Sequence, residues 1–375
     1  MTAVLQSRLC LYNCAIGSDF TSIEALQDRP YADVTNESSR QLLTASADEF
    51  FRLYGNGTTI VNAHACPGLL AKAVSFLSGH CGEQLVLSGC YGKTAVASVQ
   101  NQALQEGVAL ELYPAREPRL LRAEVTDGDV AAFIPAAGFA SEKEALAACL
   151  ASGLGVRGAL HWTNMWKMDA TARAVELGMR KRDSFYAVAR ALALCTAGPV
   201  NWSEIGEASH IPGPTVRDWT KLLESFAALD IIPAVNLKPE RRTLERPKIY
   251  WRHPGLGLWL SGRMNNPGEK LLRSLFENAV YLALVDAYPL ANVFHFADTN
   301  HVVCPMVLET EGIYRAYYFY ADALEREQAE RHHKSLVKTG KFASKAGFIE
   351  YAGMTQASRV CYAEIAAAKR SGNQP

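Results

Sequence analysis

The sequence lacks an excess of charge of either sign. Its 375 residues include 38 Lys and Arg and 38 Asp and Glu, so the formal net charge is zero. A chain without a global electrostatic field is not drawn as a whole to nucleic acid or to an anionic membrane. Affinity for either must come from a local patch of charge.

Long apolar runs are missing as well. No apolar stretch approaches the roughly 20 residues that a membrane-spanning helix needs. The first residues, Met1–Cys14, contain no charged leader followed by an apolar core and a small-residue cleavage site. We therefore expect a cytoplasmic protein without membrane insertion.

The nine cysteines include no CxxC pair, which argues against a zinc ribbon or a thiol redox motif. The densest group, His64 and Cys66 with His80 and Cys81, has the spacing of no common zinc site. We interpret the cysteines as small buried hydrophobic residues in a reducing compartment, and we expect no bound metal.

The composition is that of a folded protein, with 49% hydrophobic and 20% charged residues. A chain of this length favours two or three domains. In the first 115 residues, short apolar runs alternate with helical spacing, as over Leu69–Leu77. This alternation predicts a parallel sheet with crossover helices, whose strands we expect at Arg8–Tyr12, Thr58–Val61, Gln84–Leu87 and Val108–Tyr113.

The middle of the chain is predicted to be helical. Trp202–Ala208 is expected to form a short helix and Pro214–Leu229 a longer one, with Pro214 in its first turn. Ile231–Tyr250 then contains two extended runs around a charged tip. Helix, turn, helix and hairpin is the order of a winged helix.

The C-terminal region is expected to begin with a helix over Leu271–Tyr288. Strands follow at Val293–Phe296, Val302–Leu308 and Tyr314–Tyr320. The last of these carries rings on both faces, which favours a strand covered on both sides. An exposed aromatic edge for strand addition is the alternative.

Four stretches in this order resemble a known family. They are Leu110–Pro114 (LELYP), Pro214–Leu229 (PTVRDWTKLLESFAAL), Lys248–Trp251 (KIYW) running into Gly255–Gly257, and Leu275–Asn278 (LFEN). The sequence is similar to bacterial and archaeal predicted ATPases that join an AAA-type P-loop domain, a winged helix and a PD-(D/E)XK nuclease-like domain.

The resemblance implies an α/β fold in four parts. These are a degenerate AAA-like P-loop domain with a parallel sheet (1–118), a helical connector (119–183), a winged-helix domain (184–252) and a restriction-endonuclease-like α/β domain that is catalytically degenerate (253–375).

The nucleotide loop of the family has the form GxxxxGK[ST], in which glycine amides wrap the phosphates, Lys binds them and the hydroxyl holds magnesium. Here Gly17 is retained, but Ser18 stands in the place of the lysine and Asp19 in that of the hydroxyl. A lost cation and an added carboxylate reverse the electrostatics beside a polyphosphate. We therefore expect no nucleotide cofactor.

The second strand of the family ends in an Asp-Glu pair that assists magnesium and activates water. The matching stretch here offers Asn62 and His64, and neither replaces a metal-binding carboxylate with a base. The arginine that the family carries before its LELYP strand is also missing, with Gln105–Gly107 in that area.

Gly89–Thr94 contains a GKT sequence after a strand, which is a second candidate nucleotide loop. Only two residues separate its glycines, whereas wrapping a phosphate chain takes four. The alternative is a solvated turn that carries Lys93.

A nuclease of the PD-(D/E)XK type needs acids and a lysine that converge on the phosphodiester with a metal. Glu277 is the residual helix acid. The next strand has no acid, and its Pro305 indicates an edge or a bulge. In the last strand, Tyr318 and Tyr320 stand where an acid and a lysine are expected.

The winged-helix region offers a basic surface. A recognition helix with a basic wing is how winged helices contact DNA, although acidic neighbours such as Asp218 dilute the patch. The candidate nucleic-acid contacts are Thr215, Arg217, Lys221, Lys238, Arg241, Arg242, Arg246 and Lys248.

Three functions remain open from the sequence. The first is a catalytically inactive ATPase–nuclease homologue that binds a protein partner as a structural or regulatory subunit of a larger assembly. The second is a winged-helix protein that binds double-stranded DNA. The third is an active P-loop NTPase with relocated residues, centred on Lys93 or Glu277.

Overall fold

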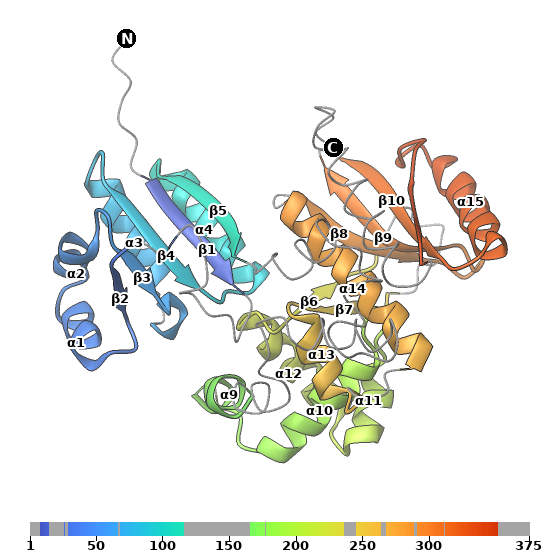
Figure 1. Cartoon of the computed structure of the whole chain (residues 1–375), viewed down its shortest axis with the longest axis horizontal. Helices are drawn as coiled ribbons and strands as arrows, with labels where there is room; N and C mark the ends of the chain where they lie inside the picture. The colour runs from blue at the N-terminus through green and yellow to red at the C-terminus, as the bar shows by residue number, and fades with distance from the viewer. Residues whose placement is uncertain are drawn as a thin grey trace, which may run out of the picture. The chain divides into compact units, whose positions relative to one another are not determined.

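The computed structural model describes residues 8–14, 26, 29–66, 68–115, 166–176, 178–235, 245–263, 268–288, 291–310 and 312–351 (Figure 1). The chain divides into two compact units. Unit 1 comprises Met1–Glu117, Thr163–Gly178 and Lys221–Ala228. Unit 2 comprises Pro118–Trp162, Met179–Thr220 and Leu229–Pro375.

Unit 1 is built on a five-stranded parallel sheet of the order β2-β3-β4-β1-β5. The parallel sheet that the sequence predicts is therefore confirmed. Its strands are β1 (Arg8–Cys14), β2 (Tyr31–Asp33), β3 (Thr59–Val61), β4 (Gln84–Gly89) and β5 (Ala109–Ala115).

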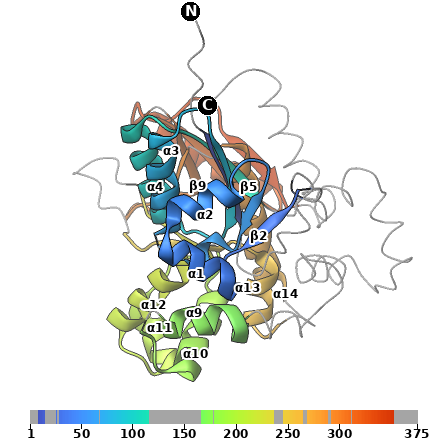
Figure 2. The same cartoon turned by 90° about the vertical axis from the view of Figure 1, so that its left-hand side faces the viewer.

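Helices cover one face of this sheet, and α3 and α4 lie side by side on it (Figures 1 and 2). Alternate residues of β1 and β4 point toward the helices and form one hydrophobic core with them. These residues are Leu9, Leu11, Leu85 and Leu87. The helices of this core are α1 (Glu37–Ala45), α2 (Ala47–Tyr54), α3 (Leu69–Gly79) and α4 (Lys93–Glu106). Helix α9 (Thr171–Glu176) also belongs to unit 1 but contributes no residue to this core.

The opposite face of the sheet carries the remaining alternate residues. Cys10 packs there with Leu26 and Val86, while Cys14 packs with Cys90 and Ala227. Both faces of β1 and β4 are thus buried, as is usual for the central strands of a parallel sheet.

Unit 2 begins with helices and a strand pair. Strands β6 (Leu229–Ile232) and β7 (Lys248–Trp251) are antiparallel, and Pro199 bridges to Lys248. This is the order of elements that the sequence predicts for the middle of the chain. The helices are α10 (Arg182–Leu194), α11 (Trp202–Ser209), α13 (Pro254–Leu260) and α12 (Gly213–Ser225), whose residues from Lys221 onward belong to unit 1.

Helix α12 ends four residues before the predicted end at Leu229. Ala227 has a φ of 57°, a left-handed conformation that stops a helix, and β6 begins two residues later. The apolar run Phe226–Leu229 continues the helical spacing in the sequence. In the structure it forms the turn after α12 and the first residue of β6.

The C-terminal part of unit 2 is a four-stranded mixed sheet of the order β11-β10-β9-β8 (Figure 1). Strands β8, β9 and β10 form an antiparallel meander, and β11 pairs parallel to β10. The elements are α14 (Gly268–Ala287), β8 (Asn292–Ala297), β9 (Val303–Thr310), β10 (Ile313–Tyr320), α15 (Ala323–Val337) and β11 (Gly347–Glu350).

Two predictions about these strands are confirmed. The register between β8 and β9 shifts between Phe294 and Phe296, opposite Val307 and Cys304, so a bulge lies at Pro305. Strand β10 lies inside the sheet with Tyr317 and Tyr318 both buried, so it is covered on its two faces and is not an exposed edge.

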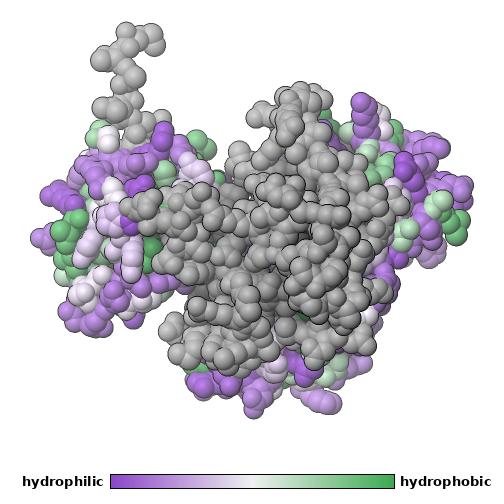
Figure 3. All heavy atoms as spheres, in the orientation of Figure 1, coloured by the Kyte–Doolittle hydropathy of each residue, from purple (hydrophilic) through white to green (hydrophobic). Residues whose placement is uncertain are grey.

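The described surface mixes polar and apolar side chains, and hydrophobic residues occur in small groups between hydrophilic ones (Figure 3). The most exposed large hydrophobic side chains are Tyr31, Leu53, Leu104, Ile313 and Leu324. Among the described helices, none is long and apolar enough to cross a membrane.

Candidate functional site

The carboxyl edge of the parallel sheet in unit 1 gathers the residues that follow β1, β3 and β4. Ligands of open parallel sheets bind at this edge because the strand ends and the loops that follow them converge there. Asn13, Asn62, His64 and Tyr91 supply the described polar contacts between these strand ends.

Asn13, near the end of β1, binds the backbone of Tyr91, the second residue after β4. Its Oδ1 accepts a hydrogen bond from the Tyr91 N–H at 2.9 Å, and its Nδ2 donates to the Tyr91 carbonyl at 3.0 Å. The Asn13 side chain is buried, so both halves of its amide must be satisfied inside the protein. This amide pairing ties the ends of β1 and β4 together.

Asn62 lies directly after β3 in a left-handed conformation, with a φ of 56°, which Asn adopts more readily than most residues. Its Nδ2 donates to Asp33 Oδ1, at the end of β2, at 3.1 Å. The Thr35 N–H and hydroxyl donate to the same oxygen at 2.8 and 2.7 Å. Burial opposes ionisation of Asp33, but these hydrogen bonds outweigh it and lower its pKa.

His64 also turns inward at this edge. Its Nδ1 accepts a hydrogen bond from the Cys90 N–H at 3.1 Å. A backbone N–H can only donate, so this nitrogen carries no proton and the ring is held in one orientation. Asn62 and His64, the two side chains that the sequence offers at the second-strand site, are therefore both engaged in contacts within unit 1.

The Gly89–Thr94 turn is not solvated in the way that the sequence suggests. Gly92 is buried and precedes the first residue of α4. Its N–H donates to the carbonyl of Ser225, in the last turn of α12, at 3.3 Å. A Cβ atom at Gly92 would lie 2.2 Å from the carbonyl oxygen of Glu224, so only glycine fits this approach.

Gly17, Ser18 and Asp19 of the predicted nucleotide loop lie outside the described residues. The same holds for Lys238, Arg241 and Arg242 at the tip of the predicted wing.

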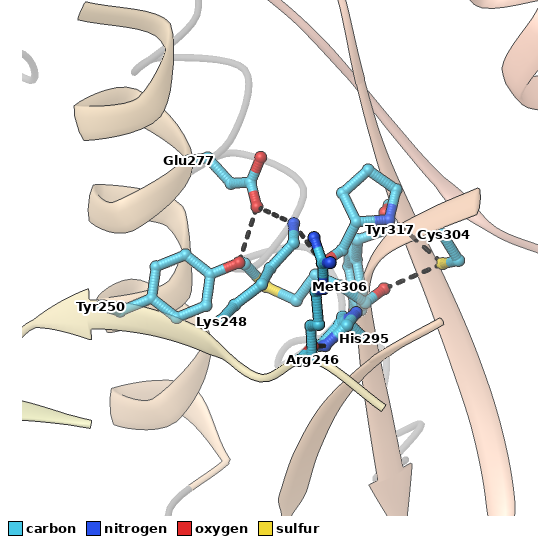
Figure 4. Close-up of polar contacts among 9 residues, drawn as sticks. Arg246, Lys248, Tyr250, Glu277, His295, Cys304, Met306 and Tyr317 are labelled. Carbon is cyan, nitrogen blue, oxygen red and sulfur yellow. Dashed lines mark hydrogen bonds and ion pairs between the residues drawn. The ribbon is translucent and has the colours of Figure 1, made fainter. Parts of the chain in front are cut away.

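The second cluster lies in unit 2 and centres on Glu277 of α14 (Figure 4). The Lys248 Nζ, on β7, lies 2.8 Å from Glu277 Oε1 and 3.0 Å from the carbonyl oxygen of Pro305, on β9. The side chains of Lys248 and Glu277 are only 9% and 15% exposed. At this burial the pair is shielded from competing water.

Tyr250, two residues after Lys248 on β7, donates its hydroxyl to the same Glu277 oxygen at 2.6 Å (Figure 4). Residues two apart on a strand share a face, which is why both reach one carboxylate. The Tyr250 ring stacks on Tyr281 with ring centroids 4.4 Å apart. Burial, followed by the charge of Glu277, raises the pKa of Tyr250 well above its usual value, so the phenol stays protonated.

His295 and Cys304 are buried beside this cluster (Figure 4). Burial, and then the charge of Lys248, lowers the pKa of His295 from 6.5 to about 4, while its Nε2 makes a 2.9 Å hydrogen bond to the Arg246 carbonyl. Because a carbonyl only accepts, Nε2 carries the proton. Burial raises the pKa of the Cys304 thiol to about 12.

The candidate nucleic-acid contacts separate into two groups. On α12, Arg217 and Lys221 are exposed and Thr215 is half-buried, and Arg246 is exposed before β7. The assignment of Lys248 to this group is wrong. A long basic side chain next to a charged tip suggests a phosphate contact in the sequence, but the strand alternation turns Lys248 inward, where Glu277 binds it.

Sequence reasoning missed two buried polar residues, Asp230 and His295, and the half-buried Asp33. Asp230 on β6 accepts the Tyr281 hydroxyl at 2.7 Å and pairs with the Arg252 Nε at 2.9 Å. An acid inside an apolar strand, as in Leu229–Ile232, is the signal that such partners are needed. Asp33 and His295 have no comparable sequence signal, because their partners follow only from the packing.

Comparison with known proteins yields limited similarity. Residues 174–266 match a protein family described as a domain of unknown function (DUF8612), and the match runs from the second half of α9 to just beyond α13. No curated protein matches the chain.

Among solved structures, the Orc1 protein of Aeropyrum pernix in complex with DNA matches over 68% of this chain and 86% of its own. The identity is 14% and the TM-score is 0.25. A superposition this loose is no basis for inferring function, which is argued below from the contacts within this chain.

Proposed function

We propose that this chain is a non-catalytic relative of the ATPase–nuclease proteins that it resembles. In this proposal it serves as a structural or regulatory subunit and binds a protein partner in a larger assembly. The observation that carries the proposal is the Lys248 amino group between Glu277 Oε1 and the Pro305 carbonyl oxygen, at 2.8 and 3.0 Å.

Carboxylate and carbonyl oxygens are the ligands that hard divalent cations prefer. In a metal-dependent nuclease such oxygens face the metal that activates water. Here a cation fixed to the chain takes that place, and the Tyr250 hydroxyl occupies the same carboxylate oxygen. A divalent ion that bound Glu277 Oε1 would have to displace both groups.

The carboxyl edge of the sheet in unit 1 supports the same proposal. Asn13 binds the Tyr91 backbone, Asn62 binds Asp33, and His64 accepts the Cys90 N–H. Polar groups that could meet a nucleotide and its magnesium are thus engaged with one another. The Gly92 N–H, at the start of α4, is engaged by Ser225, which counts against an active site relocated to Lys93.

The test is to titrate the full chain with ATP and magnesium in a calorimeter, and to incubate it with duplex and single-stranded DNA and Mg²⁺ or Mn²⁺. We expect neither nucleotide binding, turnover nor cleavage, and we expect a protein partner to remain bound through purification from native cells. Micromolar ATP binding that is abolished by substituting Ser18 or Asp19 would overturn the proposal.

A second function is favoured by the exposed basic residues of α12. Arg217 and Lys221 lie one turn apart on the helix that occupies the recognition-helix position of the predicted winged helix. Such a helix can enter the major groove of DNA while basic residues bind the flanking phosphates. Double-stranded DNA would be the ligand.

This alternative is tested by the salt dependence of duplex binding, with fluorescence anisotropy as the measurement. Replacing both Arg217 and Lys221 by Ala should weaken binding and reduce the slope of log K against log salt by about 2. The Arg241→Ala, Arg242→Ala double variant tests the wing in the same way. Lys334→Ala, an exposed lysine of α15, is the matched control. Equal binding by all four proteins would remove the winged helix as a DNA-binding surface.

A further inference from the structure

Two cysteines lie at the carboxyl ends of adjacent central strands in unit 1. Cys14 is the last residue of β1, and Cys90 directly follows β4. The parallel register pairs Asn13 with Gly89, so one further residue on each strand brings Cys14 opposite Cys90. Neighbouring strands lie about 4.8 Å apart, within the Cα separation of roughly 4.4–6.8 Å that a disulfide requires.

The two thiols also point to the same side of the sheet. Cys14 shares its face with Cys10 and Tyr12, and it packs with Cys90 and Ala227 in one small buried cluster. Burial raises the pKa of Cys14 well above its ordinary value, and Cys90 adds to that rise, as expected for neighbouring thiols.

The backbone around both residues is fixed by contacts already described. Asn13 binds both polar groups of the Tyr91 backbone, and the Cys90 N–H is held by His64. The pair is therefore brought together by the sheet and needs no large movement in order to meet.

We propose that Cys14 and Cys90 form a reversible disulfide when the protein meets a peroxide. One thiolate attacks a peroxide oxygen, the O–O bond breaks, and a sulfenic acid and water are formed. The second thiol then displaces water from that sulfur. Overall, two thiols and one hydrogen peroxide give one disulfide and two waters, and a small dithiol reverses the reaction by exchange.

Burial of the two thiols slows their oxidation. Fewer thiolates form at a raised pKa, and large oxidants are excluded, so Cys14 and Cys90 should oxidise more slowly than the exposed Cys81. The disulfide should also be reduced slowly.

The experiment treats the full chain with hydrogen peroxide, blocks the remaining thiols by alkylation and identifies cross-linked peptides by mass spectrometry without reduction. We expect a peptide pair that joins Cys14 to Cys90 and that disappears after treatment with dithiothreitol. This readout uses the wild-type protein, so it does not depend on the folding of a variant.

Cys10→Ala is the matched control because Cys10 is buried on the same face of β1, with its thiol between Glu111 and Gln84. It should retain the Cys14–Cys90 bridge, whereas Cys14→Ala and Cys90→Ala should lose it. Oxidation should raise the unfolding midpoint of the wild type by on the order of 10 °C and leave that of Cys90→Ala unchanged. Absence of the bridge, or its formation only after unfolding in urea, would overturn the proposal.

Discussion

Lys248 and His295 are best considered together, because the charge of Lys248 contributes to the low pKa of His295. Lys248 is paired with Glu277. His295 donates to the carbonyl of Arg246, which lies two residues before Lys248 in the chain. Both side chains are buried, so each interaction is made at the cost of removing a polar group from water. Changes at either residue should therefore be measurable in the free energy of unfolding.

Lys248→Met should destabilise unit 2 by about 3 kcal/mol, because it leaves the carboxylate of Glu277 without its cation. Urea unfolding followed by tryptophan fluorescence measures the effect. The double variant Lys248→Met, Glu277→Met should recover much of the loss, because it removes both charges. Lys334→Met on α15 is the control and should stay within about 0.5 kcal/mol of the wild type. A single variant as stable as the control would show that the ion pair contributes nothing.

His295 should make stability depend on pH. Its pKa is lowered from 6.5 to about 4 in the folded protein, so the unfolded chain binds a proton first as the pH falls. The stabilisation is complete above pH 6.5 and is lost as the pH falls from 6.5 to about 4, by roughly 3 kcal/mol in all at 1.36 kcal/mol per unit.

Unfolding midpoints measured across that range should fall less steeply for His295→Gln, whose amide can still donate to the Arg246 carbonyl. Lys334→Gln, at an exposed position of α15, should keep the slope of the wild type. Identical slopes for all three proteins would contradict the assignment of this titration to His295.

At the scale of elements, the start of α4 meets the end of α12 within unit 1. Gly92 brings its backbone against Glu224 and Ser225, and the Gly92 N–H donates to the Ser225 carbonyl. The N-terminal amides of one helix thereby face the C-terminal carbonyls of another, which is favourable for both helix dipoles. The glycine of the GKT sequence is thus explained by packing.

Gly92→Ala should destabilise unit 1 by about 1–3 kcal/mol, because the new Cβ would lie 2.2 Å from the Glu224 carbonyl oxygen and the two helix ends would have to separate. Gly92 has a φ of −68°, so backbone strain does not contribute. Gly79→Ala, where a Cβ meets nothing within 4 Å, is the control. Thermal unfolding of the two variants should separate them, and equal midpoints would refute the close contact.

The strands of both sheets were largely predictable from the sequence, because their apolar runs are bounded by Gly, Pro and Asn. The short strands β2 and β11 were not. Tyr31–Asp33 carries a single buried residue, and Gly347–Glu350 is too short to show a clear pattern. The end of α12 was misplaced because Phe226–Leu229 continues the helical spacing into a turn. The positions of Asn62, His64 and Glu277 were predictable, whereas their partners Asp33, Cys90 and Lys248 depend on three-dimensional packing.

At the scale of the whole molecule, the balanced charge has a consequence for association. The formal net charge is zero and the sequence pI is about 7.1, so there is little long-range repulsion between copies near neutral pH. We expect light scattering to detect more self-association at pH 7 than at pH 9 in low salt, with unfolding midpoints as the control for intact fold. Equal scattering at both pH values would contradict this expectation.

The similarity to the family described as a domain of unknown function (DUF8612) ends at residue 266, yet β7 continues to depend on residues beyond it. The backbone N–H and carbonyl of Trp251 are both bound by the Asn278 side chain, at 2.8 and 2.9 Å. A fragment cut at the limits of that similarity would leave these two groups unsatisfied and would uncover the ring of Tyr250, which Tyr281 now stacks upon. In this chain the matched segment therefore depends on α14, which completes the hydrogen bonds of β7 and covers one of its rings.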